Sequence, residues 1–193
     1  MGPVENALFG VVLGFSLAAP PGPMNAWIAA RSTRSWRAGA ITGLGAMTAD
    51  ALLGAAVFVL DGAVDLSAAV RYVYALGAAV MLLFAVRLLR RPAGGEEPAA
   101  GGRWTYLRAL GLGVSNPFQV VWWLTAGVAF AYLGGAVLLL GLFGAIAVWV
   151  VSFPAAVRGG ARRFPSFERI VRVASGAILL GFVGYFVTLF VLG

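Results

Sequence analysis

Asp50 carries the only formal charge deep inside an otherwise uncharged stretch that runs from Ala38 to Leu60. At a helical rise of about 1.5 Å per residue, it lies near the middle of that stretch, and so near the middle of a bilayer. A carboxylate there costs about 2.5–3.5 kcal/mol to insert, and ionisable groups at this depth are functional by default. Asp50 is suited to binding a proton and a cationic group in alternation. The alternative is a structural hydrogen bond to a carbonyl at a helix break.

Proline interrupts two other uncharged stretches at the same distance from an upstream glycine. Pro20 lies six residues after Gly14, and Pro117, which follows Asn116, lies six residues after Gly111. Proline removes helical hydrogen bonds, and in lipid the freed backbone is tolerated only where it is buried in protein or lines a cavity. A matched pair of interrupted helices in two halves of a chain is typical of a transporter's binding site.

Each break is followed by a sequence that favours a helix start. Asn116 and Pro117 suit the cap and the first helical position, and Pro23 also suits a first position. Because helix N-termini bind carboxylates, two such ends and one acid predict a dipolar site that fits a zwitterion. For each uncharged polar residue at the breaks, a hydrogen bond between helices is an alternative to substrate binding, and the two are given equal weight. The predicted substrate-binding and coupling residues are Asp50, Asn25, Pro20, Pro21, Gly22, Pro23, Ser115, Asn116, Pro117 and Gln119.

The composition indicates a membrane protein. Of the 193 residues, 61% are hydrophobic and 11% are charged, and the mean hydropathy is +0.93; soluble domains carry about 25% charged residues. The net charge of +7 comes from arginines that are clustered between apolar stretches, which argues against a nucleic-acid partner. The chain has no cysteine and no histidine, so disulfides, thiol relays and the usual metal ligand are excluded, and no cofactor is expected.

The chain is expected to be an all-α integral membrane protein with six transmembrane helices. The uncharged or nearly uncharged stretches are residues 6–30, 38–60, 66–86, 109–157 and 173–193. The fourth is long enough for two helices, which we expect to divide at Tyr132–Gly135. Arginine-rich loops alternate with non-basic ones, so the three basic loops are predicted inside the plasma membrane and both termini outside.

Residues 90–104 are expected to form a flexible cytoplasmic linker within a single membrane domain that covers residues 1–193. The linker separates repeat 1 (residues 4–89) from repeat 2 (residues 105–193). Each half has three spans. Because this number is odd, the second half enters the membrane from the opposite side to the first half. The paired breaks therefore predict two inverted three-helix repeats, with helices 1 and 4 broken near the midplane. The alternative is that two proline-kinked helices coincide by chance.

Small residues on the second and last stretches are interpreted as sites of close helix packing, not of binding. They are Gly39, Gly43, Gly45, Gly176, Gly181 and Gly184. Trp122 and Trp123 follow the second break. For both, aromatic packing against lipid or protein is favoured over a place in the cavity wall.

Three motifs resemble those of the lysine exporter (LysE/RhtB) family. Pro21-Gly-Pro-Met-Asn25 resembles its PGPN-type signature, Gly45-Ala-Met-Thr-Ala-Asp50 its glycine-and-aspartate stretch, and Asn116-Pro117 its NPK motif. The resemblance covers the six-span layout and is most specific over residues 14–55 and 111–125. It implies a secondary exporter of amino acids or related small metabolites, driven by a proton or cation gradient.

Two residues depart from the family pattern. Met24 is inserted between the proline and the asparagine of the signature, and Phe118 replaces the lysine that usually follows Asn-Pro. The lost positive charge puts the usual substrate in doubt and leaves a moderately apolar substrate open.

Other function classes fit the sequence less well. Intramembrane aspartyl enzymes need two facing carboxylates, but Asp50 is the only acid deep inside a stretch. Serine enzymes need a histidine or lysine base, and the chain contains neither residue. A channel or scaffold without coupled transport is the alternative function, but it would not need matched breaks around one buried acid. The expected partners are the lipid bilayer, a small zwitterionic or moderately apolar metabolite, and a coupling proton or cation. A homo-oligomer is compatible with the sequence.

Overall fold

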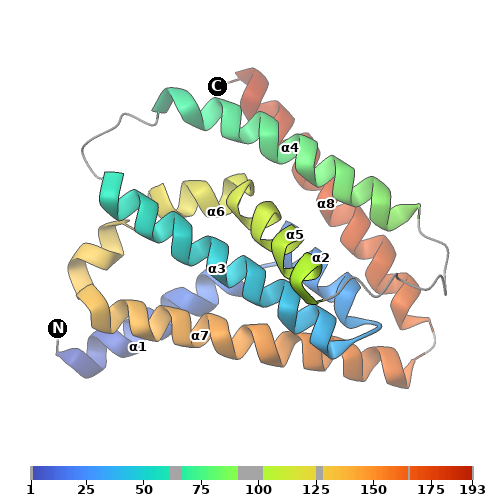
Figure 1. Ribbon diagram of the computed structural model, residues 1–193, viewed down its shortest axis with the longest axis horizontal. Coiled ribbons are helices and arrows are strands. Elements are labelled where there is room, and N and C mark those ends of the chain that lie inside the picture. The colour runs from blue at the N-terminus through green and yellow to red at the C-terminus, as the bar shows by residue number, and fades with distance from the viewer. Residues whose placement is uncertain (1, 61–66, 91–101, 125–127, 165, 193) are drawn as a thin grey trace.

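The computed structural model describes residues 2–60, 67–90, 102–124, 128–164 and 166–192. Within these ranges the chain forms eight helices and no strand (Figure 1). In chain order they are α1 (Pro3–Ala18), α2 (Pro23–Ser32), α3 (Trp36–Leu60), α4 (Ser67–Leu89), α5 (Gly102–Val114), α6 (Pro117–Trp122), α7 (Val128–Arg163) and α8 (Phe167–Leu192). The all-α prediction is confirmed for this part of the chain, whereas the predicted linker lies mostly outside it.

Both predicted helix breaks are present. α1 and α2 are bent by 78° at their break, and α2 begins at Pro23 after an extended Gly22 with φ −157° and ψ −179°. α5 ends at Val114, and α6 begins at Pro117 with Asn116 as its cap. Proline has no N–H to continue a helix but suits the first helical position, so each break both ends one helix and starts the next.

Within the described residues, the structure supports fewer spans than the predicted six. Three helical segments of this part of the chain are long and apolar enough to cross a membrane: Trp36–Val59, Gly135–Arg163 and Phe167–Leu192. The bent pair of α1 and α2 makes a fourth if it counts as one span, and Tyr74–Leu89 in α4 is a shorter apolar helix. The six-span arrangement therefore stays a prediction.

The helices extend further into charged sequence than the apolar stretches indicated. α8 starts at Phe167, ahead of the stretch that begins at residue 173, and α7 continues past Val157 to Arg163. Arginine side chains carry an apolar stem and a charged head that reaches water, so they are accommodated at the ends of membrane helices. The predicted division near Tyr132–Gly135 is seen as a kink at Gly135, where φ is 56° and ψ is −151°.

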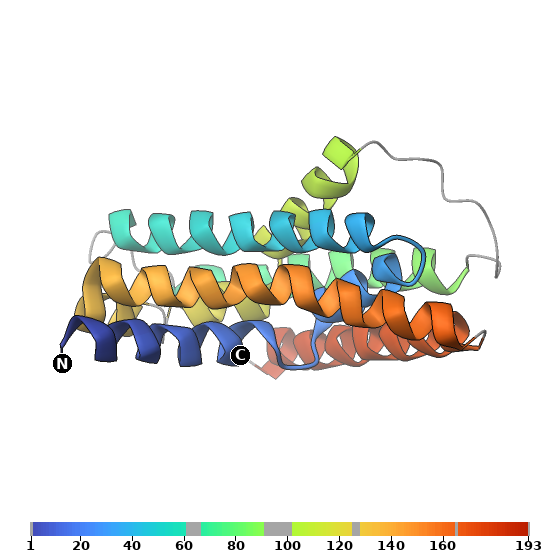
Figure 2. The same cartoon turned by 90° about the horizontal axis from the view of Figure 1, so that it is seen from below.

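Three helix pairs make the most extensive contacts: α1 with α7, α4 with α8, and α3 with α5. One buried cluster joins α1 to α7 around Leu13, Leu138 and Leu142. A second joins α2, α4, α5 and α8, and it includes the fully buried Met81 and Leu179. α7 lies between α1 and α3 and contacts both (Figure 2).

Glycines explain how two of these pairs approach so closely. A Cβ atom added at Gly10 or Gly14 of α1 would collide with backbone oxygens of α7, and one at Gly45 of α3 would meet Tyr106 and Ala109 of α5. Gly39, Gly43 and Gly176 are also tightly packed, as predicted. The prediction was wrong for the other two glycines of α8, because a Cβ atom at Gly181 or Gly184 would meet nothing within 4 Å.

The arginine-rich helix ends lie toward one end of the molecule. The ends of α4 and α7, the start of α8 and the α2–α3 connection are on the right in Figures 1 and 2, and the N-terminus of α1 is at the opposite end. Arg34 forms an ion pair with Glu168 of α8, with 2.8 Å between Nη2 and Oε1. The Arg158 guanidinium donates to the Thr33 carbonyl, and the Trp36 indole N–H donates to the Val151 carbonyl at 3.1 Å.

Candidate functional site

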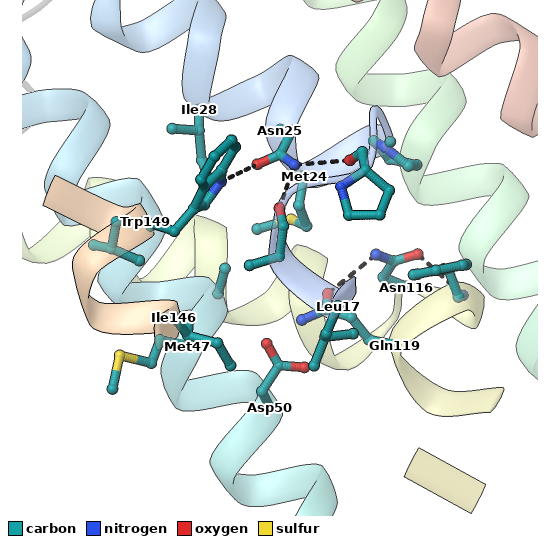
Figure 3. Close-up of a pocket in the computed structure, with 18 of the residues that line it drawn as sticks. Leu17, Met24, Asn25, Ile28, Met47, Asp50, Asn116, Gln119, Ile146 and Trp149 are labelled. Carbon is teal, nitrogen blue, oxygen red and sulfur yellow. Dashed lines mark hydrogen bonds between the residues drawn. The ribbon is translucent and has the colours of Figure 1, made fainter. Parts of the chain in front are cut away.

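A cavity of about 100 Å³ lies between the two helix breaks (Figure 3). Its walls come from α1, α2, α3, α6, α7 and α8 and from the turn that joins α1 to α2. Eight of the ten predicted site residues line it: Pro20, Pro21, Gly22, Pro23, Asn25, Asp50, Asn116 and Gln119. The two breaks and the buried acid, which are far apart in the sequence, therefore border one space.

The other two predicted residues do not line the cavity. Ser115 donates its hydroxyl to the Gly111 carbonyl at 2.8 Å, which satisfies a carbonyl at the end of α5. Pro117 is fully buried and packs against Gly77 of α4, where a side chain would collide with the proline ring. Both residues shape the second break without facing the cavity.

Asp50 projects from α3 into this space and is 5% exposed. Its Oδ1 atom accepts a hydrogen bond from the indole N–H of Trp123 at 3.1 Å. The Gln119 side chain forms a second hydrogen bond to the same carboxyl group. A buried polar group is costly without such partners, so these two donors stabilise the acid where it lies.

Asn116 connects the second break to this acid. It is 2% exposed, and its Oδ1 atom accepts the Phe118 N–H at 3.2 Å, which caps α6. Its Nδ2 atom donates to Gln119 Oε1 at 3.0 Å. Because the Gln119 oxygen is used by Asn116, its amide N–H₂ group is the end available to Asp50. A hydrogen-bonded chain thus runs from the cap of α6 to the carboxyl group.

Asn25 holds the first break together. Its Nδ2 atom donates to the carbonyls of Ala18 and Pro20, at 2.5 and 2.8 Å. Its Oδ1 atom accepts the indole N–H of Trp149 at 3.1 Å, and the Trp149 ring stacks on Phe153 with 4.9 Å between centroids. Both amide protons and the amide oxygen are engaged, so Asn25 satisfies backbone that the prolines free and ties it to α7.

The remaining cavity wall is mostly apolar. Asp50 is the sole charged side chain among the described residues that line it. Met47, Ile146 and Phe182 contribute apolar surface, and Phe118, which is 42% exposed, lies at the second break. No group of three or more histidine, cysteine, aspartate or glutamate residues that could hold a metal occurs in the described part of the chain. The chemistry available to this cavity is that of one carboxyl group in an apolar, amide-lined space.

Sequence reasoning missed two tryptophans at this site. Trp123 was expected to pack against lipid or protein, but it is 1% exposed and donates to Asp50. No sequence motif marked Trp149, which is partly buried. The N–H group of a tryptophan that is removed from water usually finds an acceptor, which is a signal for both residues. A further signal for Trp123 is Gly54, one turn after Asp50, where a Cβ atom would crowd the indole ring.

Comparison with known proteins places the chain in a family of membrane transporters. No curated protein and no solved structure matches the chain significantly. The family model described as LysE type translocator matches residues 15–189, a range that includes both helix breaks, Asp50 and both tryptophans. Because this match covers most of the sequence, the chain belongs to the LysE type translocator family.

Proposed function

We propose that this protein is a secondary transporter that exports amino acids or related small metabolites across the plasma membrane, coupled to a proton or cation gradient. The observation that carries the proposal is the cavity between two broken helices, in which Asp50 is the one charged group of the described wall. Binding sites of secondary transporters lie where discontinuous helices meet near the bilayer midplane. The cavity has room for several water molecules or a small polar group.

Asp50 is the proposed coupling residue. A carboxyl group in an apolar cavity is costly as an isolated charge, but it can bind either a proton or the ammonium group of a substrate. The proton and the ammonium group cannot occupy Asp50 at the same time. Their movements across the membrane are therefore coupled in opposite directions. The hydrogen bonds from Trp123 and Gln119 fix the carboxyl group in place while its occupant changes.

The carboxylate of a zwitterionic substrate would lie at the start of α2. Gly22, the cap of this helix, provides no side-chain hydrogen bond, and the first-turn residues Met24 and Asn25 border the cavity. Backbone N–H groups at such an end attract anions. At the start of α6 the Asn116 side chain already accepts the Phe118 N–H, so we assign the carboxylate to α2 instead of to both helix ends.

The proposal includes six spans in two inverted repeats, with both termini outside. The helix pairing supports it. Exchange of the two halves would interchange α1 with α5 and α3 with α7, and it would therefore turn the α1–α7 contact into the α5–α3 contact. The α4–α8 contact would map onto itself. These are the three most extensive helix contacts in the structure.

Transport in inside-out membrane vesicles tests the function. Labelled amino acids should accumulate when a proton or sodium gradient is imposed, and collapse of the gradient with an ionophore should abolish accumulation. Passive equilibration that no gradient alters would favour the channel alternative. A methyl ester, which lacks the carboxylate charge, should compete much more weakly than the free acid. Equal competition by the two would contradict the assignment of the carboxylate to α2.

A further inference from the structure

An apolar groove of about 510 Å³ opens beside the cavity, on the exposed side of α8. It is lined by Pro21, Ile178, Gly181, Phe182 and Tyr185. Tyr185 is 56% exposed, and Gly181 is also exposed. Apart from the tyrosine hydroxyl, these side chains offer no group that binds a polar ligand, so the groove suits an apolar occupant.

The groove and the cavity share two wall residues. Pro21 and Phe182 line both spaces. Pro21 belongs to the first helix break, and the Phe182 ring lies among other aromatic rings, 5.7 Å from Phe186 and 6.4 Å from Tyr185 between centroids. The groove therefore adjoins the candidate site, and Pro21 and Phe182 form the wall that the two spaces share.

The shape and lining of the two spaces indicate what each can hold. The cavity, at about 100 Å³, is the more enclosed of the two, whereas the groove, at about 510 Å³, is open to the surface of the protein. The charged head of an amino acid requires the carboxyl group and helix start that only the cavity offers. A bulky side chain requires apolar surface, which the groove provides in excess.

We propose that the groove is the subsite for the apolar side chain of the substrate, and that Phe182 determines specificity at the boundary. The substrate class is then an amphipathic amino acid, with its ammonium and carboxylate in the cavity and a large apolar side chain past Phe182. This assignment rests on the proposed transport function and makes it more specific. A lipid acyl chain is the competing occupant.

A substitution at Gly181 tests the groove assignment without disturbing the packing of the helices. A Cβ atom there meets nothing within 4 Å, so Gly181→Leu adds bulk to the groove alone. Leucine also favours the helix more than glycine does. Gly184→Leu is the matched control, because Gly184 is on the same helix, equally open, and does not line the groove. Both variants should elute like the wild type in size-exclusion chromatography.

The experiment compares gradient-driven uptake of labelled phenylalanine and labelled alanine in inside-out vesicles. Gly181→Leu should slow phenylalanine transport about tenfold or more, in the range expected for lost apolar pocket contacts, and leave alanine within about twofold. Gly184→Leu should change neither rate. Unchanged phenylalanine transport in Gly181→Leu, or a wild type that carries alanine but not phenylalanine, would overturn the groove assignment and favour a lipid occupant. A wild type that carries no amino acid under any gradient would overturn the transport function as well.

Discussion

The indole N–H of Trp123 donates to the carboxyl group of Asp50 across 3.1 Å, and both side chains are buried. Asp50 belongs to α3 in the first half of the chain, and Trp123 follows α6 in the second half. The bond therefore joins the two halves at the acid itself. Trp123 also stacks on Phe143 of α7, with 6.2 Å between centroids, so three helical segments fix the position of one carboxyl group.

Asp50→Asn should abolish or strongly reduce gradient-driven transport while the protein still inserts and folds. The amide has nearly the same volume, and its oxygen can still accept the Trp123 N–H, but it can neither exchange a proton nor pair with an ammonium group. Uptake in inside-out vesicles with and without a pH gradient measures the effect. Export at the wild-type rate under the same gradient would make Asp50 a structural residue.

Trp123→Phe removes the N–H donor and keeps an aromatic ring that can stack on Phe143. A hydrogen bond to a charged group contributes about 1.5–3 kcal/mol, so we expect the gradient-driven rate to fall about tenfold, less than in Asp50→Asn. Trp104→Phe is the control, because Trp104 is 61% exposed near the start of α5. If the two tryptophan variants transport equally well, the bond to Asp50 does not serve function.

Local effects explain what the sequence predicted correctly. Proline removes a helical hydrogen bond, so Pro20 and Pro117 indicated the positions of both breaks. Pro154, by contrast, lies inside α7 without ending that helix. Asp50 was identified because an isolated charge in such a stretch is rare. The two breaks and Asp50 border one cavity. This could be predicted because the helical rise per residue places all three at a similar depth in the bilayer.

Contacts between distant segments explain what the sequence did not predict. Trp123 and Asp50 are 73 residues apart, and Trp149 and Asn25 are 124 residues apart. No local pattern reveals such a partner. Likewise, the spacing of Gly176 and Gly181 does not show which of them faces another helix: Gly176 packs against Leu89 of α4, whereas Gly181 is open.

Asn25→Asp should destabilise the protein. The carboxylate keeps an oxygen for Trp149 but cannot donate to the carbonyls of Ala18 and Pro20. Each acceptor left without a partner costs about 1–3 kcal/mol, so the two together cost about 2–6 kcal/mol, which for a chain of this length corresponds to a fall in Tm of about 4–24 °C. Ser16→Ala is the control, since Ser16 is exposed and bonds only within its own helix, to Leu13. Similar Tm values for the two variants in detergent would refute the role of Asn25 at the break.

Single cysteines should establish which end of the molecule is cytoplasmic, because the natural chain has no cysteine that would react. Gly159, near the arginine-rich end of α7, is exposed and has space for a side chain. Ala136 is exposed beyond the kink in α7. It is preferable to Gly135, whose φ of 56° would strain any other residue.

Basic loops remain on the cytoplasmic side of a membrane, so Gly159→Cys should resist an impermeant maleimide in intact cells and react in inside-out vesicles. Ala136→Cys should show the reverse pattern, and the cysteine-free chain should react in neither. Reaction of both cysteines from the same side would show that the segment between them does not cross the membrane. That result would contradict the proposed topology at the helix whose length and hydropathy support a span most strongly.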